Sequence, residues 1–200
     1  RGVDKSRVEP GQFFLFFPAV VACYFALPGR WRWVVLLLAS YVFYMAWEPG
    51  YVLLIWASTL VDYVAGLLLG RAKGQWRRRG LLAASLAVNL GLLFFFKYYN
   101  FFADTLRPLL ASIGWEVTLP YAEVLLPVGI SFYTFQTLSY TIDVYRGHQE
   151  PERHLGRFAL YVAFFPQLVA GPIERPQHLL PQFKRSHHFD YDSVTGGLQL

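Results

Sequence analysis

Six blocks of apolar residues, separated by short polar or basic segments, form the main pattern of this chain. A helix needs about 20 predominantly apolar residues to cross a bilayer, so a block of that size predicts a transmembrane helix. Five of the blocks reach or approach this length. The pattern therefore predicts an all-α integral membrane protein with about five transmembrane helices, at 13–28, 31–47, 51–70, 81–102 and 124–145.

The sixth block, at 158–173, is short for a crossing and is interrupted by Pro166, Gly171 and Pro172. Basic residues lie on both sides of it, which indicates that both flanks face the cytoplasm. Irregular backbone at membrane depth survives only where protein covers it or where it lines a water-filled cavity. We therefore predict a re-entrant element, broken at Pro166 and at Gly171 and Pro172, that is buried inside a larger bundle.

The distribution of charge orients these helices. The segment 71–79 contains five basic residues and no acid, whereas 103–123 contains one basic residue and three acids. Cytoplasmic loops carry the excess of Lys and Arg, so the first segment is predicted to be a cytoplasmic loop and the second to lie outside. Gly114 and Pro120 argue against a long helix in the outer segment. Counting back along the chain, the amino terminus is predicted to lie outside.

Composition supports the bilayer as the solvent of this chain. Hydrophobic residues make up 55% and charged residues 16%, where about a quarter charged is usual in soluble proteins. The net charge of +5 does not indicate nucleic-acid binding, because the aromatic residues lie inside apolar blocks rather than on a solvated basic face. The single cysteine, Cys23, excludes an internal disulfide and a cysteine metal cluster.

One acidic residue, Asp62, lies in the middle of the third block. A carboxylate at membrane depth is costly and is usually paired or turned towards a cavity. Two hypotheses follow: Asp62 is a proton or substrate site, or it makes a hydrogen bond between packed helices. The sequence leaves both open.

Several polar residues interrupt the stretch 125–147, which reads LLPVGISFYTFQTLSYTIDVYRG. Gln136, Tyr140 and Asp143 are spaced i, i+4 and i+7 and therefore share one helix face. Such a stripe can hold helices together or line a substrate cavity. We interpret it as cavity-lining, because the stripe is long and a broken segment follows it. The predicted cavity residues are Ser131, Tyr133, Gln136, Tyr140, Asp143, Gly171, Pro172, Glu174 and Arg175.

The chain contains no complete catalytic motif. Its five histidines lie in polar stretches and are interpreted as solvated loop residues. The motifs HExxH, GxSxG, CxxC and the Walker loop do not occur in the sequence. We predict no metal site and no bound cofactor.

The stretch 125–147 and the following FALYVAFFPQLVAGPIERPQHLLPQF, at 158–183, resemble the membrane-bound O-acyltransferases of bacteria. The similar branch is that of the alginate O-acetyltransferases and their cell-wall relatives. LLLASYVFYMAWEPGYVLLI and LLFFFKYYNFF, which begin at Leu36 and Leu92, fit the amino-terminal half of that branch. The resemblance extends over nearly the whole chain.

This resemblance implies a ring of membrane helices around a thin core with re-entrant segments, in the bacterial inner membrane. It implies transfer of an acyl group, often acetyl, from a cytoplasmic thioester to hydroxyls of an extracytoplasmic polysaccharide. The donor would be acetyl-CoA or a carrier-protein thioester, and a periplasmic polysaccharide-modifying transferase would be a partner.

The catalytic histidine of the family follows a tryptophan, and no Trp-His pair occurs here. We therefore expect that histidine beyond Leu200. The chain is expected to be the amino-terminal portion of a single membrane acyltransferase domain, truncated at both ends, and to be inactive alone.

Two other functions are compatible with the same pattern. Polar stripes and broken helices also form the midplane binding sites of transporters. A non-catalytic membrane scaffold that recruits a soluble carrier or transferase to the basic loops is the third hypothesis.

Overall fold

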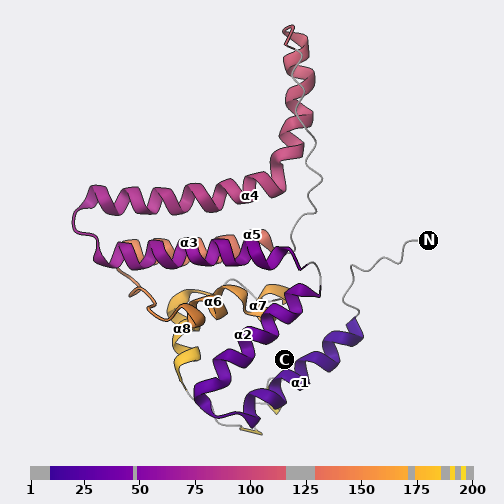
Figure 1. Cartoon of the computed structure of the whole chain (residues 1–200), viewed down its shortest axis with the longest axis vertical. Coiled ribbons are helices and arrows are strands. Elements are labelled where there is room, and N and C mark those ends of the chain that lie inside the picture. The colour runs from indigo at the N-terminus through magenta and orange to yellow at the C-terminus, as the bar shows by residue number, and fades with distance from the viewer. Residues whose placement is uncertain are drawn as a thin grey trace.

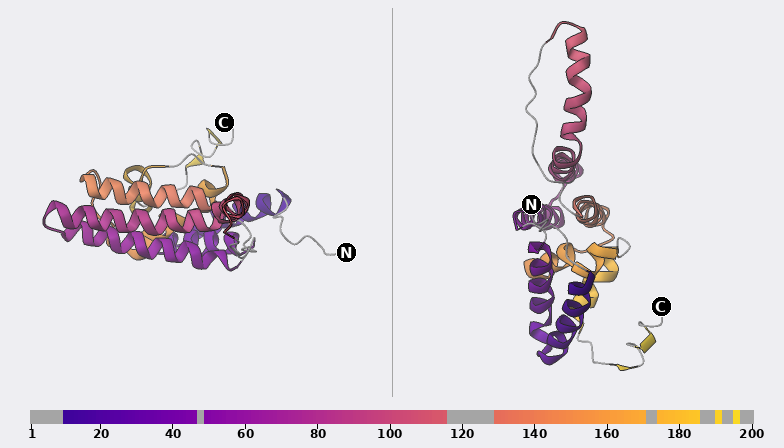
Figure 2. Two further views of the ribbon diagram at one scale, coloured as in Figure 1. Left: turned by 90° about the horizontal axis from the view of Figure 1, so that it is seen from above. Right: turned by 90° about the vertical axis from the view of Figure 1, so that its right-hand side faces the viewer.

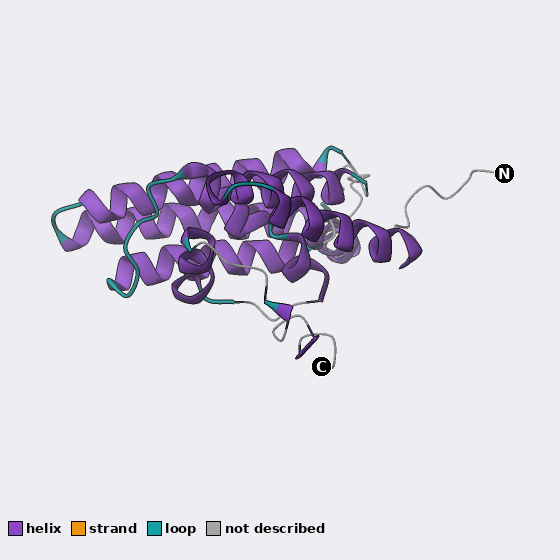
Figure 3. Cartoon of the chain, turned by 90° about the horizontal axis from the view of Figure 1, so that it is seen from below, coloured by secondary structure: helices purple, strands orange, loops and turns teal. Residues whose placement is uncertain are grey.

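The computed structural model describes residues 10–46, 49–115, 129–170, 174–185, 190, 191, 195 and 196. Helices are the regular elements of this described part (Figures 1 and 3). They are α1 (Pro10–Ala26), α2 (Gly29–Met45), α3 (Tyr51–Arg71), α4 (Gln75–Ser112), α5 (Ile130–Arg146), α6 (Leu155–Ala163), α7 (Phe165–Ala170) and α8 (Pro176–Lys184).

The helices form a layered bundle. α3, α4 and α5 run side by side and pack on one another (Figures 1 and 2). The short helices α6, α7 and α8 lie on the other side of α3 from α4, where α6 packs between α2 and α3. α1 packs against α2 at the outer edge of the bundle.

The lengths of the helices agree with membrane character. α3 and α4, with 21 and 38 residues, are long and apolar enough to cross a bilayer. α1, α2 and α5 have 17 residues each, which corresponds to about 25 Å at 1.5 Å per residue and lies at the short end of the spanning range. The all-α prediction is confirmed for the described residues, and the number of crossings stays a prediction.

Helix α4 differs from the prediction at both ends. It begins at Gln75 rather than near 81, so Arg77, Arg78 and Arg79 belong to its first turns and not to a loop. Charged side chains at a helix end can face water or headgroups while the backbone stays helical, and hydropathy alone does not detect this. At the other end α4 continues beyond 102 to Ser112, and its last part turns away from the bundle (Figure 1).

α4 ends just before Gly114, one of the two residues that argue against a long helix in the outer segment. This glycine has a φ of +82°, in the left-handed region that other residues rarely adopt. The rest of the outer segment, from 116 onward, lies outside the described residues.

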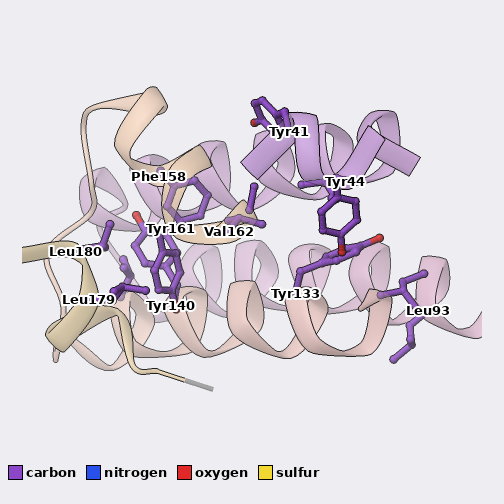
Figure 4. Packing of buried hydrophobic residues seen from close by; sticks show 14 of the residues in the cluster. Tyr41, Tyr44, Leu93, Tyr133, Tyr140, Phe158, Tyr161, Val162, Leu179 and Leu180 are labelled. Atoms are coloured by element: carbon purple, nitrogen blue, oxygen red, sulfur yellow. The ribbon is translucent and has the colours of Figure 1, made fainter. Parts of the chain in front are cut away.

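The broken segment forms the centre of the packing. Every side chain from Phe158 to Ala163 in α6 is at most 1% exposed. A helix that is apolar on all sides is buried on all sides, which is the burial that the sequence predicts for this segment. Figure 4 shows the surrounding cluster, whose labelled members are Tyr41, Tyr44, Leu93, Tyr133, Tyr140, Phe158, Tyr161, Val162, Leu179 and Leu180.

Small residues bring α3 close to α5. The buried face of α3 includes Ser58, Ala65 and Gly66. A Cβ added to Gly66 would lie 2.7 Å from the hydroxyl oxygen of Tyr140, so only glycine leaves room for this tyrosine. Small residues allow membrane helices to approach in this way.

Candidate functional site

The break between α6 and α7 lies at Phe164. α6 ends at Ala163, and α7 begins at Phe165 with Pro166 as its second residue. Proline has no N–H and clashes with the carbonyl four residues earlier, so a helix ends before it. The predicted break at Pro166 is therefore present. The second predicted break, at Gly171 and Pro172, lies outside the described residues, as do these two cavity candidates.

Side chains from two neighbouring helices bond to the backbone of the break. Gln136 of α5 donates from Nε2 to the main-chain oxygen of Tyr161, at 2.8 Å, and to Oε1 of Gln167, at 3.1 Å. The Tyr161 hydroxyl donates in return to the main-chain oxygen of Gln136. On the other side, Oγ of Ser40 accepts the N–H of Phe165 at 3.2 Å.

These bonds have a simple physical reason. Each helix end leaves N–H or C=O groups without an intrahelical partner, and no water is available for them in the hydrocarbon core. Gln136 is 1% exposed and Ser40 is fully buried. The two side chains therefore allow α6 and α7 to separate inside the bundle.

The loop before α6 and the end of α8, which lie on either side of the broken segment, contact each other. Glu152, in the loop before α6, forms an ion pair with Lys184 at the end of α8, with Oε2 2.6 Å from Nζ. The N–H of Glu152 also donates to the hydroxyl of Tyr140 at 2.9 Å. The segment thus begins and finishes at the same end of the bundle, which is what a re-entrant element requires.

Asp62 lies in a buried polar cluster formed by three helices. From α4, Ser85 donates from Oγ to Oδ1 of Asp62, and Asn89 donates from Nδ2 to Oδ2 at 2.9 Å. From α5, Thr141 donates to Oδ1 at 3.0 Å. Both carboxylate oxygens of a fully buried Asp62 are therefore engaged. Of the two hypotheses for Asp62, these contacts match the hydrogen bond between packed helices.

The predicted stripe on α5 divides into buried and peripheral residues. Gln136 and Tyr140 both face α6, and Tyr133 is buried with its side chain directed towards Tyr44 of α2 (Figure 4). Asp143 lies nearer the surface, with Oδ1 3.9 Å from Nδ1 of His148. The buried three make packing and hydrogen-bonding contacts, and their cavity-lining role stays a prediction.

The remaining predicted cavity residues lie apart from this face. Oγ of Ser131 accepts from Nζ of Lys97 at 3.4 Å. Glu174 has Oε2 3.9 Å from Nδ1 of His178, and Arg175 is exposed directly before α8. The structure does not bring these three residues together with Gln136.

Most basic residues gather at one end of the bundle, which we call the basic end. Arg78 at the start of α4 donates to the main-chain oxygens of Val144 and Tyr145 at the end of α5, where the helix dipole favours a cation. The ion pair of Glu152 joins the end of α8 to this region. The basic end comprises Arg30, Arg32, Arg71, Arg77, Arg78, Arg79, Arg146, Arg153, Lys184 and Arg185.

A cleft of about 600 Å³ opens at the basic end, where α3 meets the loop before α6. Its walls include Arg71, Gly70, Glu150 and Arg153. The hydroxyl of Tyr63 donates to the main-chain oxygen of Arg153 and fixes the loop against α3. Two arginines and one glutamate therefore line the cleft.

One of the five histidines, His154, lies at an exposed loop position and also caps a helix. Nδ1 of His154 accepts the N–H of Arg157 and caps α6, while the imidazole ring lies 4.8 Å from the ring of Trp33. This residue is exposed but has a structural role, because a helix start needs an acceptor for its first N–H groups. Among the described residues, no group of three or more His, Cys, Asp or Glu could hold a metal ion.

Some of the contact partners in these clusters could be predicted from the sequence, and others could not. Asn89 and Ser85 lie four residues apart in an apolar block, and the rule that intramembrane polar groups pair would connect them to Asp62. Ser40, Glu152 and Lys184 carry no such signal, because their roles depend on contacts between segments distant in the chain.

Comparison with known proteins yields curated relatives. The chain is 43% identical over 180 residues to a probable alginate O-acetylase of Azotobacter vinelandii, which covers 88% of the chain and 36% of the relative. It is 41% identical over 176 residues to a probable alginate O-acetylase of Pseudomonas aeruginosa, covering 88% and 34%. It is 30% identical over 220 residues to a peptidoglycan O-acetyltransferase of Helicobacter pylori, covering 92% and 40%.

The chain thus spans about a third of the length of the alginate O-acetylases that it matches. No protein-family profile matches the chain. No solved structure matches it either.

Proposed function

Because this chain is a relative of the bacterial alginate O-acetylases, the branch of the membrane-bound O-acyltransferases that its sequence resembles, we propose that it forms part of a membrane enzyme that acetylates polysaccharide hydroxyls. The observation that carries the proposal is the 40–43% identity to proteins of this name over 88% of the chain. The names of the relatives share acetyl transfer to a glycan but differ in the glycan. The acceptor class of this protein is accordingly a glycan hydroxyl.

The reaction needs a base and a set of hydrogen-bond donors from the protein. A base removes the hydroxyl proton, the hydroxyl oxygen attacks the thioester carbonyl, and the C–S bond breaks as the thiol leaves with a proton. Hydrogen-bond donors stabilise the oxyanion that forms in between. By the family resemblance we assign the base to a histidine that directly follows a tryptophan, and this sequence contains no such pair. The chain described here supplies the wall of the site.

The basic end is the side on which we place the acyl donor. Acetyl-CoA and the phosphopantetheine arm of a carrier protein both carry phosphate, which guanidinium groups bind by charge and by paired hydrogen bonds. Arg71 and Arg153 in the cleft beside α3 are suitably placed for this. By the positive-inside rule this end is cytoplasmic, with the amino terminus outside. The polysaccharide and a periplasmic transferase partner would then lie on the other side of the inner membrane.

The broken segment supports an enzyme with a thin core. α6 to α8 enter and return at the basic end, and their backbone is satisfied by Gln136 and Ser40 rather than by water. A re-entrant segment of this kind shortens the distance between the two aqueous phases. The transporter alternative has less support, because the buried polar groups that it would use at the midplane, those of Asp62 and Gln136, bond to other protein groups.

Acetyl transfer in reconstituted vesicles tests the proposal. The whole protein is supplied with radiolabelled acetyl-CoA or an acetylated carrier on the side of the basic end, and with mannuronate oligomers or peptidoglycan fragments on the other. Label on a glycan hydroxyl is the expected result. Failure of every donor and acceptor pair, with the protein correctly inserted, would count against a transferase. Transfer by residues 1–200 alone would refute the assignment of the base to a histidine of a Trp-His pair, because these residues contain none.

A further inference from the structure

A cleft with two compartments lies between α1 and the rest of the bundle. The first compartment, of about 180 Å³, opens at the basic end between α1, α2 and α8. The second, of about 160 Å³, lies between α1, α2 and α7. Tyr24, Leu36 and Phe164 line both, so the compartments adjoin. We call them together the α1 cleft.

The two compartments differ in polarity. Arg32 and Arg185 line the first, and its described walls contain no carboxylate. The second has no polar surface and is lined by side chains such as Val21, Phe25 and Pro166. The α1 cleft is therefore basic at its mouth and apolar inside.

Arg32 is held in position at the mouth. Its Nε donates to the main-chain oxygen of Leu27 at 3.1 Å. Its guanidinium carbon lies 5.0 Å from the ring centre of Tyr24 and 5.6 Å from that of Phe25. Stacking on aromatic rings orients a guanidinium, so the positive charge of Arg32 is held at the mouth of the cleft.

The packing of α1 explains why the cleft exists. The first half of α1 is fixed by aromatic contacts, with Phe16 5.4 Å from Phe165 and Phe13 6.2 Å from Phe43 between ring centres. In its second half the cleft lies between α1 and the neighbouring helices. α1 thus packs through aromatic rings in its first half, whereas in its second half Arg32 contacts Tyr24 and Phe25 beside the cleft.

We propose that the α1 cleft binds one anionic phospholipid, with the phosphate between Arg32 and Arg185 and an acyl chain in the apolar compartment beside Pro166. Three observations carry this. The cleft joins a basic mouth to an apolar interior, its mouth lies at the end of the bundle where Lys and Arg concentrate, and it opens between membrane helices. Basic pockets between helices on the cytoplasmic side are suited to anionic headgroups. The bound lipid would connect α1 to α8, and this role is independent of the transferase activity.

Lipid binding to the purified protein tests the proposal. The protein is delipidated in a non-ionic detergent and titrated with phosphatidylglycerol, or with phosphatidylcholine of the same acyl chains, in native mass spectrometry. We expect one tightly retained phosphatidylglycerol per chain and at least tenfold weaker binding of phosphatidylcholine. Arg32→Gln with Arg185→Gln should remove this preference.

Two matched controls separate the site from general effects. Arg77→Gln with Arg79→Gln removes the same charge from exposed positions on α4 and should change the affinity less than twofold. Val21→Trp fills the apolar compartment and should weaken binding at least tenfold, whereas Ala22→Trp places the same side chain on the exposed side of α1 and should not.

Other outcomes would overturn the proposal. Equal binding of both lipids, unchanged in the double arginine variant, would mean that the cleft has no headgroup site. Glycerol phosphate binding as tightly as the phospholipid would reduce the cleft to a phosphate site. Stoichiometric displacement of the lipid by coenzyme A, lost in the same variant, would identify the α1 cleft as a donor site instead.

Discussion

Glu152 and Lys184 form an ion pair across 32 residues of chain, with Oε2 2.6 Å from Nζ. The first lies in the loop before α6 and the second in the last turn of α8, so the pair closes the broken segment into a unit. The carboxylate is 5% exposed, whereas the lysine is half-exposed. The pair therefore consists of a buried acid whose charge is satisfied by a cation at the surface.

Removal of Lys184 alone should lower the free energy of unfolding more than removal of both Lys184 and the Glu152 charge. Lys184→Met leaves a buried carboxylate without its cation, and we expect a loss of about 1–2 kcal/mol in the free energy of unfolding, reduced by the exposure of the lysine. Glu152→Gln with Lys184→Met should be less destabilised than Lys184→Met alone. Denaturant unfolding in detergent measures both. A double variant less stable than either single variant would contradict a role for the pair.

Because the Glu152–Lys184 pair holds both ends of the re-entrant segment on one side, it predicts which residues face the cytoplasm. In a Cys23→Ser background, cysteines at Arg77, Arg146 and Arg185 should react with a membrane-impermeant reagent only from the cytoplasmic side. Gly50→Cys, in the turn before α3, should react only from outside. Gly50 has open space around its Cα, so a cysteine fits there. External labelling of Arg185→Cys would rule out the re-entrant segment.

Loss of the Gln136 amide should destabilise the helix break. Gln136→Ala leaves the main-chain oxygen of Tyr161 without its buried donor, which we expect to cost about 1–3 kcal/mol. Gln149→Ala is the matched control, because its amide donates to the main-chain oxygen of Glu150 in an exposed loop; its effect should stay below about 0.5 kcal/mol.

The Gln136 variant also tests function. In the whole protein, Gln136→Ala and Asp143→Asn should lower the proposed acetyl transfer while membrane insertion is retained. Wild-type turnover in both variants would show that the stripe on α5 only holds helices together.

Asp62 and Asn89 should be energetically coupled. Each Ala substitution and the double variant form a cycle in which we expect a coupling of about 0.5–3 kcal/mol. The pair Asp62→Ala and Thr105→Ala should be additive, because Thr105 is exposed and bonds within its own helix. If Asp62 were instead a proton site, Asp62→Asn would abolish activity and leave the free energy of unfolding unchanged.

Gly66 should not tolerate a methyl group. Gly66→Ala brings a Cβ to 2.7 Å from the Tyr140 hydroxyl, which is itself bonded to Glu152. We expect a loss of about 1–3 kcal/mol from this overpacking. Gly91→Ala, in the interior of α4 with open space around it, should be neutral or stabilising by up to about 1 kcal/mol. Equal stability of the two variants would contradict the close approach of α3 and α5.

Much of the helical pattern was predictable from local features. The blocks at 13–28, 31–47 and 51–70 correspond to α1, α2 and α3 within a few residues, because an apolar run bounded by turn residues identifies a membrane helix without reference to the fold. The break at Pro166 follows from the missing N–H of proline. The ends of α4 were wrong, since hydropathy does not detect a helix that continues into charged or polar turns.

The candidate site was predictable only in part. The spacing of Gln136 and Tyr140 placed both on one face, and the structure has both directed at α6. The spacing of these residues does not predict which side chains contact that face of α5. In the structure this face contacts Phe158 and Tyr161, and the cavity-lining role of its residues stays a prediction.

The sequence alone determined that the chain is helical, where most helices begin and end, and which residues would be polar in an apolar surrounding. These features depend on the chemistry of near neighbours along the chain. Only the tertiary structure decided the partners. Ser40 meets Phe165 across 125 residues and Asp62 meets Thr141 across 79. A buried polar group must bond to whatever the packing brings within about 3 Å, and that depends on how the helices cross.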